Sequence, residues 1–113
     1  MGYRFTVKFL QEADDFLTSL EKETKKKIMY NIWKSKLLND MNLFKKLTDE
    51  IWEFRTLYNQ TQYRLLAFWD NTEEVETFVI ATHGFIKKSS KVPPNEIKKA
   101  KQLMKQYYIS KNK

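Results

Sequence analysis

The sequence has no cysteine, two glycines, two prolines and a single histidine among its 113 residues. Without cysteine the chain cannot form a disulfide framework, a cysteine-based zinc site or a thiolate nucleophile. Two glycines are too few for a phosphate-binding glycine loop. No apolar run approaches the roughly 20 residues of a membrane span, and the N-terminus has no apolar signal-peptide core. We therefore expect a cytoplasmic protein with no cofactor, no metal site and no membrane partner.

Charge is spread unevenly along the chain, whose formal net charge is +7. Residues 1–86 carry 12 basic and 13 acidic side chains, a balance of −1, whereas residues 87–113 carry nine lysines and one glutamate, a balance of +8. An excess of positive charge confined to residues 87–113 predicts an anionic partner for this segment, with nucleic acid favoured over a membrane surface. A solvated basic tail is the alternative.

Apolar periodicity predicts a single α+β domain over residues 1–113. Apolar and polar side chains alternate over residues 3–9, which predicts a strand. The spacing becomes helical over residues 12–38, where Thr18 followed by Glu21 has the form of a capping box, so we predict a helical hairpin and not one long helix. The segment that contains Phe44 and Leu47 is expected to be a connection packed on the core.

Three β-prone runs follow, at residues 51–57, 63–69 and 76–85, and short polar connectors between them predict an antiparallel meander. The two prolines at 93–94 then open a last segment with helical spacing, a pattern typical of a helix start. The predicted order is strand, helical hairpin, three strands and helix, with the helices covering an antiparallel sheet. The three tryptophans are expected in the core: Trp33, Trp52 and Trp69.

The chain changes abruptly from a buried strand to a lysine cluster after the apolar run 78–81. Lys87, Lys88 and Lys91 follow this run and precede the prolines. A cation held between two rigid elements can be aimed at a particular phosphate, so this strand-to-helix corner is the candidate site. A solvated lysine loop is the alternative.

Arg64 lies within an otherwise apolar strand, where an unpaired charge would be costly. One interpretation is a structural ion pair with Glu53 of the preceding strand. The other is that Arg64 and Arg55 face the open side of the sheet and extend the lysine corner into a concave cationic surface suited to a phosphodiester backbone. His83 stands at a buried strand end, which favours packing over catalysis.

Four stretches together, IWEFR, YRLLAFW, ATHGFIKKSSKVPP and EIKKAKQLMKQY, resemble the toxins of bacterial type II toxin–antitoxin modules. The similarity is to the RelE/HigB-type toxins, in particular their phage-related branch, and it covers about residues 50–108. It implies a RelE-like fold and a metal-independent endoribonuclease that cuts mRNA, commonly on the ribosome. It also implies a cognate antitoxin, DNA-binding and encoded by the adjacent gene.

By this resemblance Arg64, Lys88 and Lys91 are the catalytic residues, and Arg55 and Lys87 bind RNA. Cationic side chains would stabilise the charge that develops when the ribose 2′-OH attacks the adjacent phosphate. The tyrosine that some family members place in the first turn of the last helix is absent, so the general base stays open among four residues: Lys91, His83, Tyr107 and Tyr108.

Two other functions remain open. A ParE-like toxin that inhibits DNA gyrase shares the fold and needs no catalytic residues. A non-enzymatic nucleic-acid-binding module would use the same lysines for affinity alone and would show a steep salt dependence without forming product.

Overall fold

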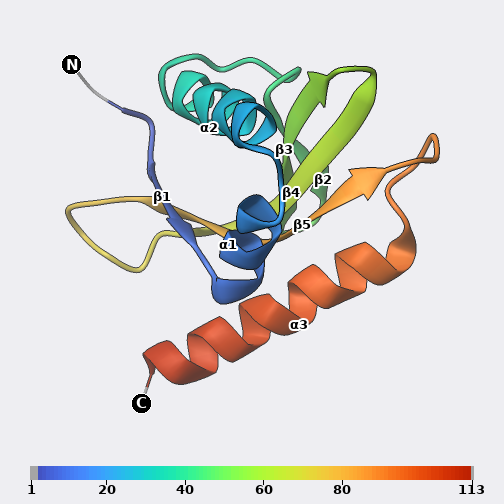
Figure 1. Ribbon diagram of the computed structural model, residues 1–113. Helices are drawn as coiled ribbons and strands as arrows, with labels where there is room; N and C mark the ends of the chain where they lie inside the picture. Colours follow the sequence, from blue (N-terminus) through green and yellow to red (C-terminus); the bar gives the residue numbers. More distant parts are fainter. Residues whose placement is uncertain (1–2, 113) are drawn as a thin grey trace.

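The computed structural model describes residues 3–112. Over this range the chain forms three helices and one five-stranded sheet in the order β1-β5-β4-β3-β2 (Figure 1). The α+β class predicted from the sequence is confirmed. No helix within these residues is both long and apolar enough to cross a membrane.

The first third of the chain forms β1 (Thr6–Phe9), α1 (Gln11–Thr18) and α2 (Lys22–Leu37). The predicted division into two helices is confirmed, but the capping box predicted at its boundary is wrong. Thr18 is the last residue of α1, and Glu21, the N-cap of α2, makes no side-chain capping hydrogen bond. The two helices are instead separated because each packs its own apolar face on the sheet.

The predicted meander is confirmed as β3 (Ile51–Tyr58), β4 (Thr61–Asp70) and β5 (Phe78–Lys87). An additional strand, β2 (Phe44–Thr48), pairs antiparallel with β3 at the sheet edge, where a connection was predicted. This strand is short and irregular, and its register shifts between Lys46 and Thr48. Short edge strands that carry lysine are common because they discourage pairing with other chains, and they give a weak sequence signal.

The sheet is mixed, because β1 pairs in parallel with β5. Thr6 pairs with Phe78 and Phe9 pairs with Ala81, which brings the start of the chain beside its last strand. The prediction that the whole sheet is antiparallel is therefore wrong at this edge. Parallel neighbours need a crossover connection, and α1, α2, β2, β3 and β4 together supply it.

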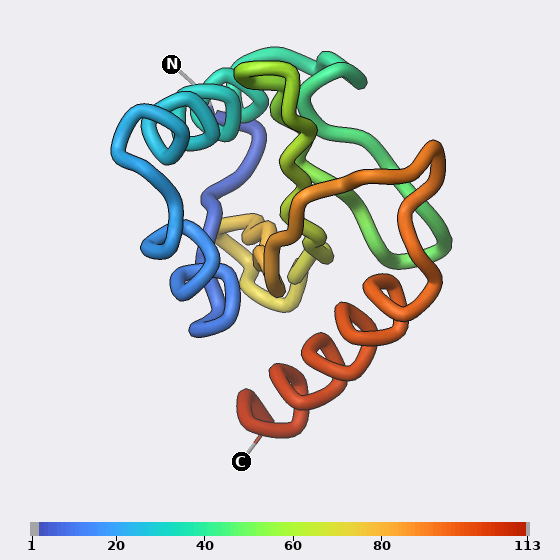
Figure 2. Tube along the Cα trace, turned by 45° about the vertical axis from the view of Figure 1, so that its right-hand side comes forward, coloured from blue at the N-terminus to red at the C-terminus, as the bar shows by residue number. Residues whose placement is uncertain are grey.

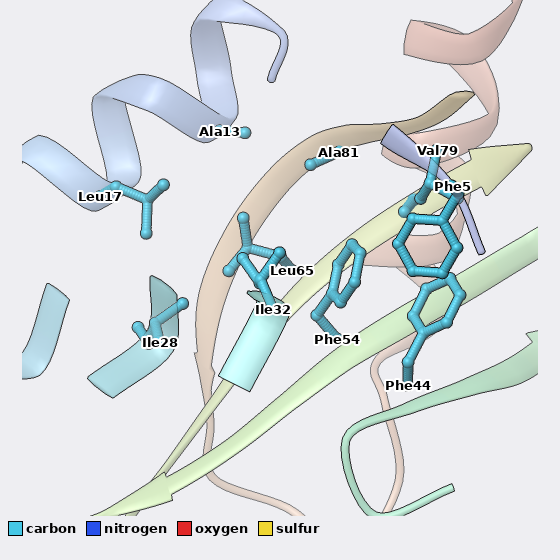
Figure 3. Packing of buried hydrophobic residues seen from close by; sticks show 11 residues of the cluster. Phe5, Ala13, Leu17, Ile28, Ile32, Phe44, Phe54, Leu65, Val79 and Ala81 are labelled. Carbon is cyan, nitrogen blue, oxygen red and sulfur yellow. The ribbon is translucent and has the colours of Figure 1, made fainter. Parts of the chain in front are cut away.

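Helices cover both faces of the sheet. Helices α1 and α2 lie on one face, and α3 (Pro94–Lys111) runs along the other (Figures 1 and 2). Because side chains alternate along each strand, the two faces of the sheet contribute to two separate cores. The core under α1 and α2 contains eleven buried residues (Figure 3). The core under α3 is smaller and consists of Ile51, Leu66, Phe68, Ile80 and Ala100.

The tryptophans do not all lie in the core as predicted. Trp52 and Trp69 are partly buried and pack against the core under α1 and α2. Trp33 is 45% exposed on the outer side of α2, beside Tyr30. The prediction is wrong for Trp33 because α2 buries the side defined by Thr24, Ile28 and Asn31, and Trp33 lies outside that side.

Candidate functional site

The predicted lysine corner connects the end of β5 to the start of α3. Pro94 occupies the first helical position, where a missing N–H leaves no hydrogen bond unmade. The backbone N–H of Glu96 donates to the Pro93 carbonyl over 3.0 Å, and the Ser89 hydroxyl donates to the Lys91 carbonyl over 2.7 Å. These bonds shape the connection, so the lysines lie between two fixed elements as predicted.

A β-bulge decides which lysine faces which side of the sheet. Leu66 of β4 pairs with His83, but its neighbour Ala67 pairs with Ala81, so Thr82 is an extra residue in β5. The Thr82 hydroxyl donates to the Leu66 carbonyl over 3.1 Å. An extra residue reverses the alternation beyond it, and His83, Phe85 and Lys87 therefore face α3.

Lys87 lines a cleft of about 450 Å³ at the N-terminal end of α3. Arg55, Lys87 and Lys91, three of the five residues predicted for the site, come together here. The fourth, Lys88, is exposed and is not among the lining residues. The fifth, Arg64, lies in a buried pair beside the cleft. The remaining lining residues come from β2, from β3 and from the corner: Lys45, Lys46, Leu47, Glu53, Ser90 and Val92.

The two lysines of β2 were missed by the sequence interpretation. Lys45 pairs with Glu53 across the strands and so faces α3, while Lys46 lines the cleft from the neighbouring position. Their sequence signal was the run FKKL, which has apolar residues on either side of two cations. Recognising that run as a strand would have placed cations on the wall of the cleft opposite Lys91.

Arg64 forms the ion pair that was one of its two interpretations. Its Nε lies 3.0 Å from Glu53 Oε1, and both side chains are nearly inaccessible to solvent. These two atoms make no aligned hydrogen bond, however, so the pair is an electrostatic contact only. The guanidinium also donates from Nη2 to Gln62 Oε1 over 2.7 Å and from Nη1 to the Tyr63 carbonyl over 3.1 Å. Arg64 therefore helps to organise the site and does not extend into the cleft.

The cleft changes the acid–base properties of Lys87. Partial burial lowers the pKa of Lys87 below its ordinary value, and the nearby positive charges of Arg64, Arg55 and Lys45 lower it further. Glu53 acts in the opposite direction. A lysine surrounded by cations gives up its proton more readily than an isolated one.

Of the four residues left open as general base, Lys91 lines the cleft. His83 is buried and lies between Thr82 Oγ1, 3.1 Å from Nδ1, and Glu96 Oε1, 3.0 Å from Nε2. These contacts join β5 to α3, which agrees with the packing role expected for His83. Tyr107 and Tyr108 lie near the other end of α3, where their hydroxyls donate to Asp70 Oδ2 and to the Trp69 carbonyl. Burial and the bond to Asp70 raise the pKa of Tyr107 to about 12.

Within residues 3–112 no group of three or more histidine, aspartate or glutamate side chains is arranged to hold a metal ion. The cations that converge on the cleft are side chains from three separate segments. Fixed cations of this kind can hold a phosphodiester and stabilise charge that develops on it, while Glu53 and Lys87 are groups that can exchange protons.

The sequence model for the family described as phage derived protein Gp49-like (DUF891) matches residues 15–105, a span that includes α2, the whole meander and most of α3. No curated protein matches the chain.

Proposed function

Because the chain belongs to the phage-derived Gp49-like family, which is related to the RelE and HigB toxins, we propose that it is the toxin of a type II toxin–antitoxin module. Its activity is that of an endoribonuclease that cuts mRNA on the ribosome and so inhibits translation. A DNA-binding antitoxin encoded by the adjacent gene neutralises it. On this proposal the positive charge needed for cleavage comes from side chains of the cleft.

One observation carries the proposal: cations from β2, β3 and the corner surround a single carboxylate in one cleft. Arg55, Lys45 and Lys91 bind the phosphate of the RNA backbone and stabilise the extra negative charge of the pentacoordinate transition state. The 2′-oxygen forms a bond to phosphorus while the bond to the 5′-oxygen breaks, which yields a 2′,3′-cyclic phosphate and a 5′-hydroxyl.

Two proton transfers accompany this step. One group in the cleft accepts the proton of the 2′-OH, and another donates a proton to the departing 5′-oxygen. Glu53 and Lys87 are the groups whose chemistry suits the pair of transfers, with Lys87 favoured as a proton carrier by its lowered pKa. Lys88, exposed beside the cleft, belongs on this proposal to the surface that contacts the ribosome or the antitoxin.

The test is primer extension on mRNA translated in a cell-free system, with end-group analysis of the fragments. We expect cleavage products with 2′,3′-cyclic phosphate ends. Lys87→Ala should reduce the cleavage rate by roughly 100-fold to 10,000-fold, as the loss of a general acid or base does. Lys101→Ala, a matched change at an exposed lysine of α3 outside the cleft, should leave the rate within about twofold of the wild type.

Other outcomes favour the competing functions. Intact mRNA together with inhibited DNA gyrase would support a ParE-like toxin. Intact mRNA together with salt-sensitive RNA binding would support a non-enzymatic binding module. Equal activity of Lys87→Ala and Lys101→Ala would show that the cleft is not the catalytic site.

A further inference from the structure

A hollow of about 360 Å³ lies beside the C-terminal half of α3, away from the lysine corner. Met104 and Tyr108 line it from the helix, which places it roughly 15–20 Å along the helix axis from Pro94. Its volume falls within the roughly 300–1,000 Å³ of ligand sites. The other lining residues come from β3, from β4 and from two connections: Asp49, Glu50, Trp52, Phe68, Trp69 and Asn71.

One wall of this hollow is the end of β4. The pairing of β3 with β4 ends at Trp52 and Ala67, and β4 continues for three residues past this pair, to Asp70. The Tyr108 hydroxyl donates to the Trp69 carbonyl over 3.1 Å, which attaches α3 to this extension. A side chain that enters the hollow therefore meets a fixed surface of strand and helix.

Three partly exposed aromatic rings line the hollow: Trp52, Trp69 and Tyr108. The ring centroids of the two tryptophans are 5.6 Å apart and their planes are inclined at 72°, so the two rings meet at a corner. Phe44 stacks on Trp52, with 5.0 Å between the centroids, and supports that ring from the core. Aromatic side chains gathered around an opening form the cages in which proteins hold organic cations.

Two carboxylates complete the lining. Thr48 pairs with Ile51, so a turn of only two residues positions Asp49 and Glu50, and both are exposed. Burial raises the pKa of Tyr108, and negative charge, including that of Glu50, raises it further, as expected for a carboxylate near this ring. Among the described residues no lysine or arginine lines the hollow, although the net charge of the chain is +7.

The connection between β4 and β5 extends the acidic surface, and it lies toward the end of α3 opposite the lysine corner (Figure 1). Residues 71–77 contain no basic side chain and three exposed glutamates: Glu73, Glu74 and Glu76. Val75, between them, is 99% exposed. A surface with this charge repels nucleic acid and is complementary to a basic segment of another protein.

We propose that this hollow is the docking site for an arginine side chain of a partner protein. The guanidinium stacks on the exposed rings of Trp52 and Trp69, and its N–H groups donate to the carboxylates of Asp49 and Glu50. The exposed acidic connection faces the residues that flank this arginine. The inference goes beyond the proposed function and does not depend on RNA cleavage.

The chemistry of the lining favours arginine over lysine. A guanidinium is planar, stacks on aromatic rings, pairs bidentately with carboxylates and is more weakly hydrated than an ammonium group. Arginine, tryptophan and tyrosine are also the residues that most often dominate the affinity of protein interfaces. The hollow thus offers two of these three residue types to a partner that supplies the third.

The test follows the three tryptophan indole N–H resonances by NMR during titration with N-acetyl-argininamide, whose two ends are neutral as in a peptide. The Trp52 and Trp69 resonances should shift, whereas that of Trp33, on α2 and outside the hollow, should not. The arginine probe should bind about tenfold more tightly than its neutral citrulline analogue and about threefold more tightly than its lysine analogue.

Two matched variants isolate the carboxylates. Asp49→Asn/Glu50→Gln removes both charges with little change of shape, and should bring the arginine and citrulline affinities within about twofold of each other. Glu21→Gln, at an exposed glutamate outside the hollow, should keep the tenfold preference. Thermal unfolding of both variants confirms that they are folded.

Equal binding of the arginine and citrulline probes by the wild type would overturn the docking site, as would a preference that persists in the double variant. Shifts at Trp33 as large as those at Trp52 and Trp69 would also count against it. Free arginine that binds more tightly than the capped probe would indicate a site for the amino acid and overturn docking of a partner. RNA cleavage enters none of these measurements, so the docking site and the endoribonuclease proposal fail separately.

Discussion

The face of the sheet under α3 has a buried carboxylate at each end, and the two carboxylates differ in how completely they are hydrogen-bonded. Asp70, at the end near the C-terminus of α3, accepts hydrogen bonds from Thr72, Tyr107 and Lys111. Glu53, at the end near the cleft, has its ion pair with Arg64 but no aligned hydrogen bond between Oε1 and Nε. Buried polar groups in folded proteins are usually satisfied, so an incompletely satisfied one needs an explanation.

On the proposed function, this difference separates an end that holds the fold from an end that binds a ligand. At the first end Asp70 finds its partners within the chain, and Tyr107 and Lys111 attach α3 to the sheet through it. At the second end the cations exceed the carboxylates, and one of them, Lys87, has a lowered pKa. Departures from full satisfaction are expected at functional or strained sites, so this end is the better candidate for a functional site.

The largest loss of folding stability is expected for Arg64→Ala, which tests how strongly the end of the sheet near the cleft also supports the fold. This change leaves Glu53 buried without its counter-charge, and breaking such a pair costs about 3–5 kcal/mol. Urea unfolding at neutral pH measures the loss. The double variant Glu53→Gln/Arg64→Gln, which removes both charges, should lose less. A single variant as stable as the wild type would mean that Arg64 serves the substrate alone.

An intermediate effect is expected for Asp70→Asn at the other end. The change weakens several hydrogen bonds to a charged acceptor and should cost about 1–3 kcal/mol at pH 7. Burial alone would raise the pKa of Asp70, but the hydrogen bonds from Lys111, Thr72 and Tyr107 hold it well below its usual range. The stability that the Asp70 carboxylate contributes is therefore fully present above the unfolded-state pKa of about 4. It is lost as the pH falls through the folded-state pKa.

Unfolding at pH 7 and at pH 3 checks this prediction. The gap in free energy of unfolding between wild type and Asp70→Asn should narrow at the lower pH. Asp49→Asn, at an exposed aspartate in the turn between β2 and β3, should show almost no gap at either pH. A gap that is constant between the two pH values would contradict the lowered pKa.

The smallest effect on stability is expected for His83, whose partner on β4, Leu66, also pairs with Glu53. Burial lowers the pKa of His83, with Lys99 acting in the same direction and Glu96 and Glu12 acting against it. The unfolded chain then binds the proton more readily, so stability should fall as the pH drops below about 6.5. Comparing unfolding at pH 7.5 and pH 5.5 in the wild type and in His83→Gln isolates this loss. A wild type that becomes more stable at pH 5.5 would indicate a charged His83–Glu96 pair instead.

Most of the fold could be predicted from side-chain alternation and helical spacing, because these patterns follow directly from which side of an element is buried. Strands β1 and β3–β5, the helical hairpin and α3 were all found in this way. Strand β2 was not, because its pairing depends on a neighbour in space and its short run contains two lysines. Trp33 was misplaced because apolar residues occur on both sides of α2, and only the packed structure distinguishes them.

The candidate site could be predicted in part. Which lysines face the cleft could not be predicted, because their directions depend on the bulge at Thr82. The sequence shows a cluster of lysines after β5, but their directions depend on the alternation along that strand. A bulge is an added residue that no pattern in this stretch reveals. Without it, Lys88 would face the same side as α3 and Lys87 would face the other. A smaller hollow beside the cleft, lined by Asn42, Arg55 and Gln62, could not be predicted either, because only the path of the chain before β2 brings Asn42 and Gln62 together.

The parallel pairing of β1 with β5 has a consequence for the order in which the protein folds. The N-terminal strand has no partner until the chain has been made as far as Ala81, and the cleft has no second wall until residues 87–92 follow. Contacts between such distant parts of a sequence slow folding, because the intervening chain must be ordered first. A chain interrupted before β5 therefore holds neither the complete sheet nor the cleft, and any activity of the cleft would first arise once residues 87–92 have been made.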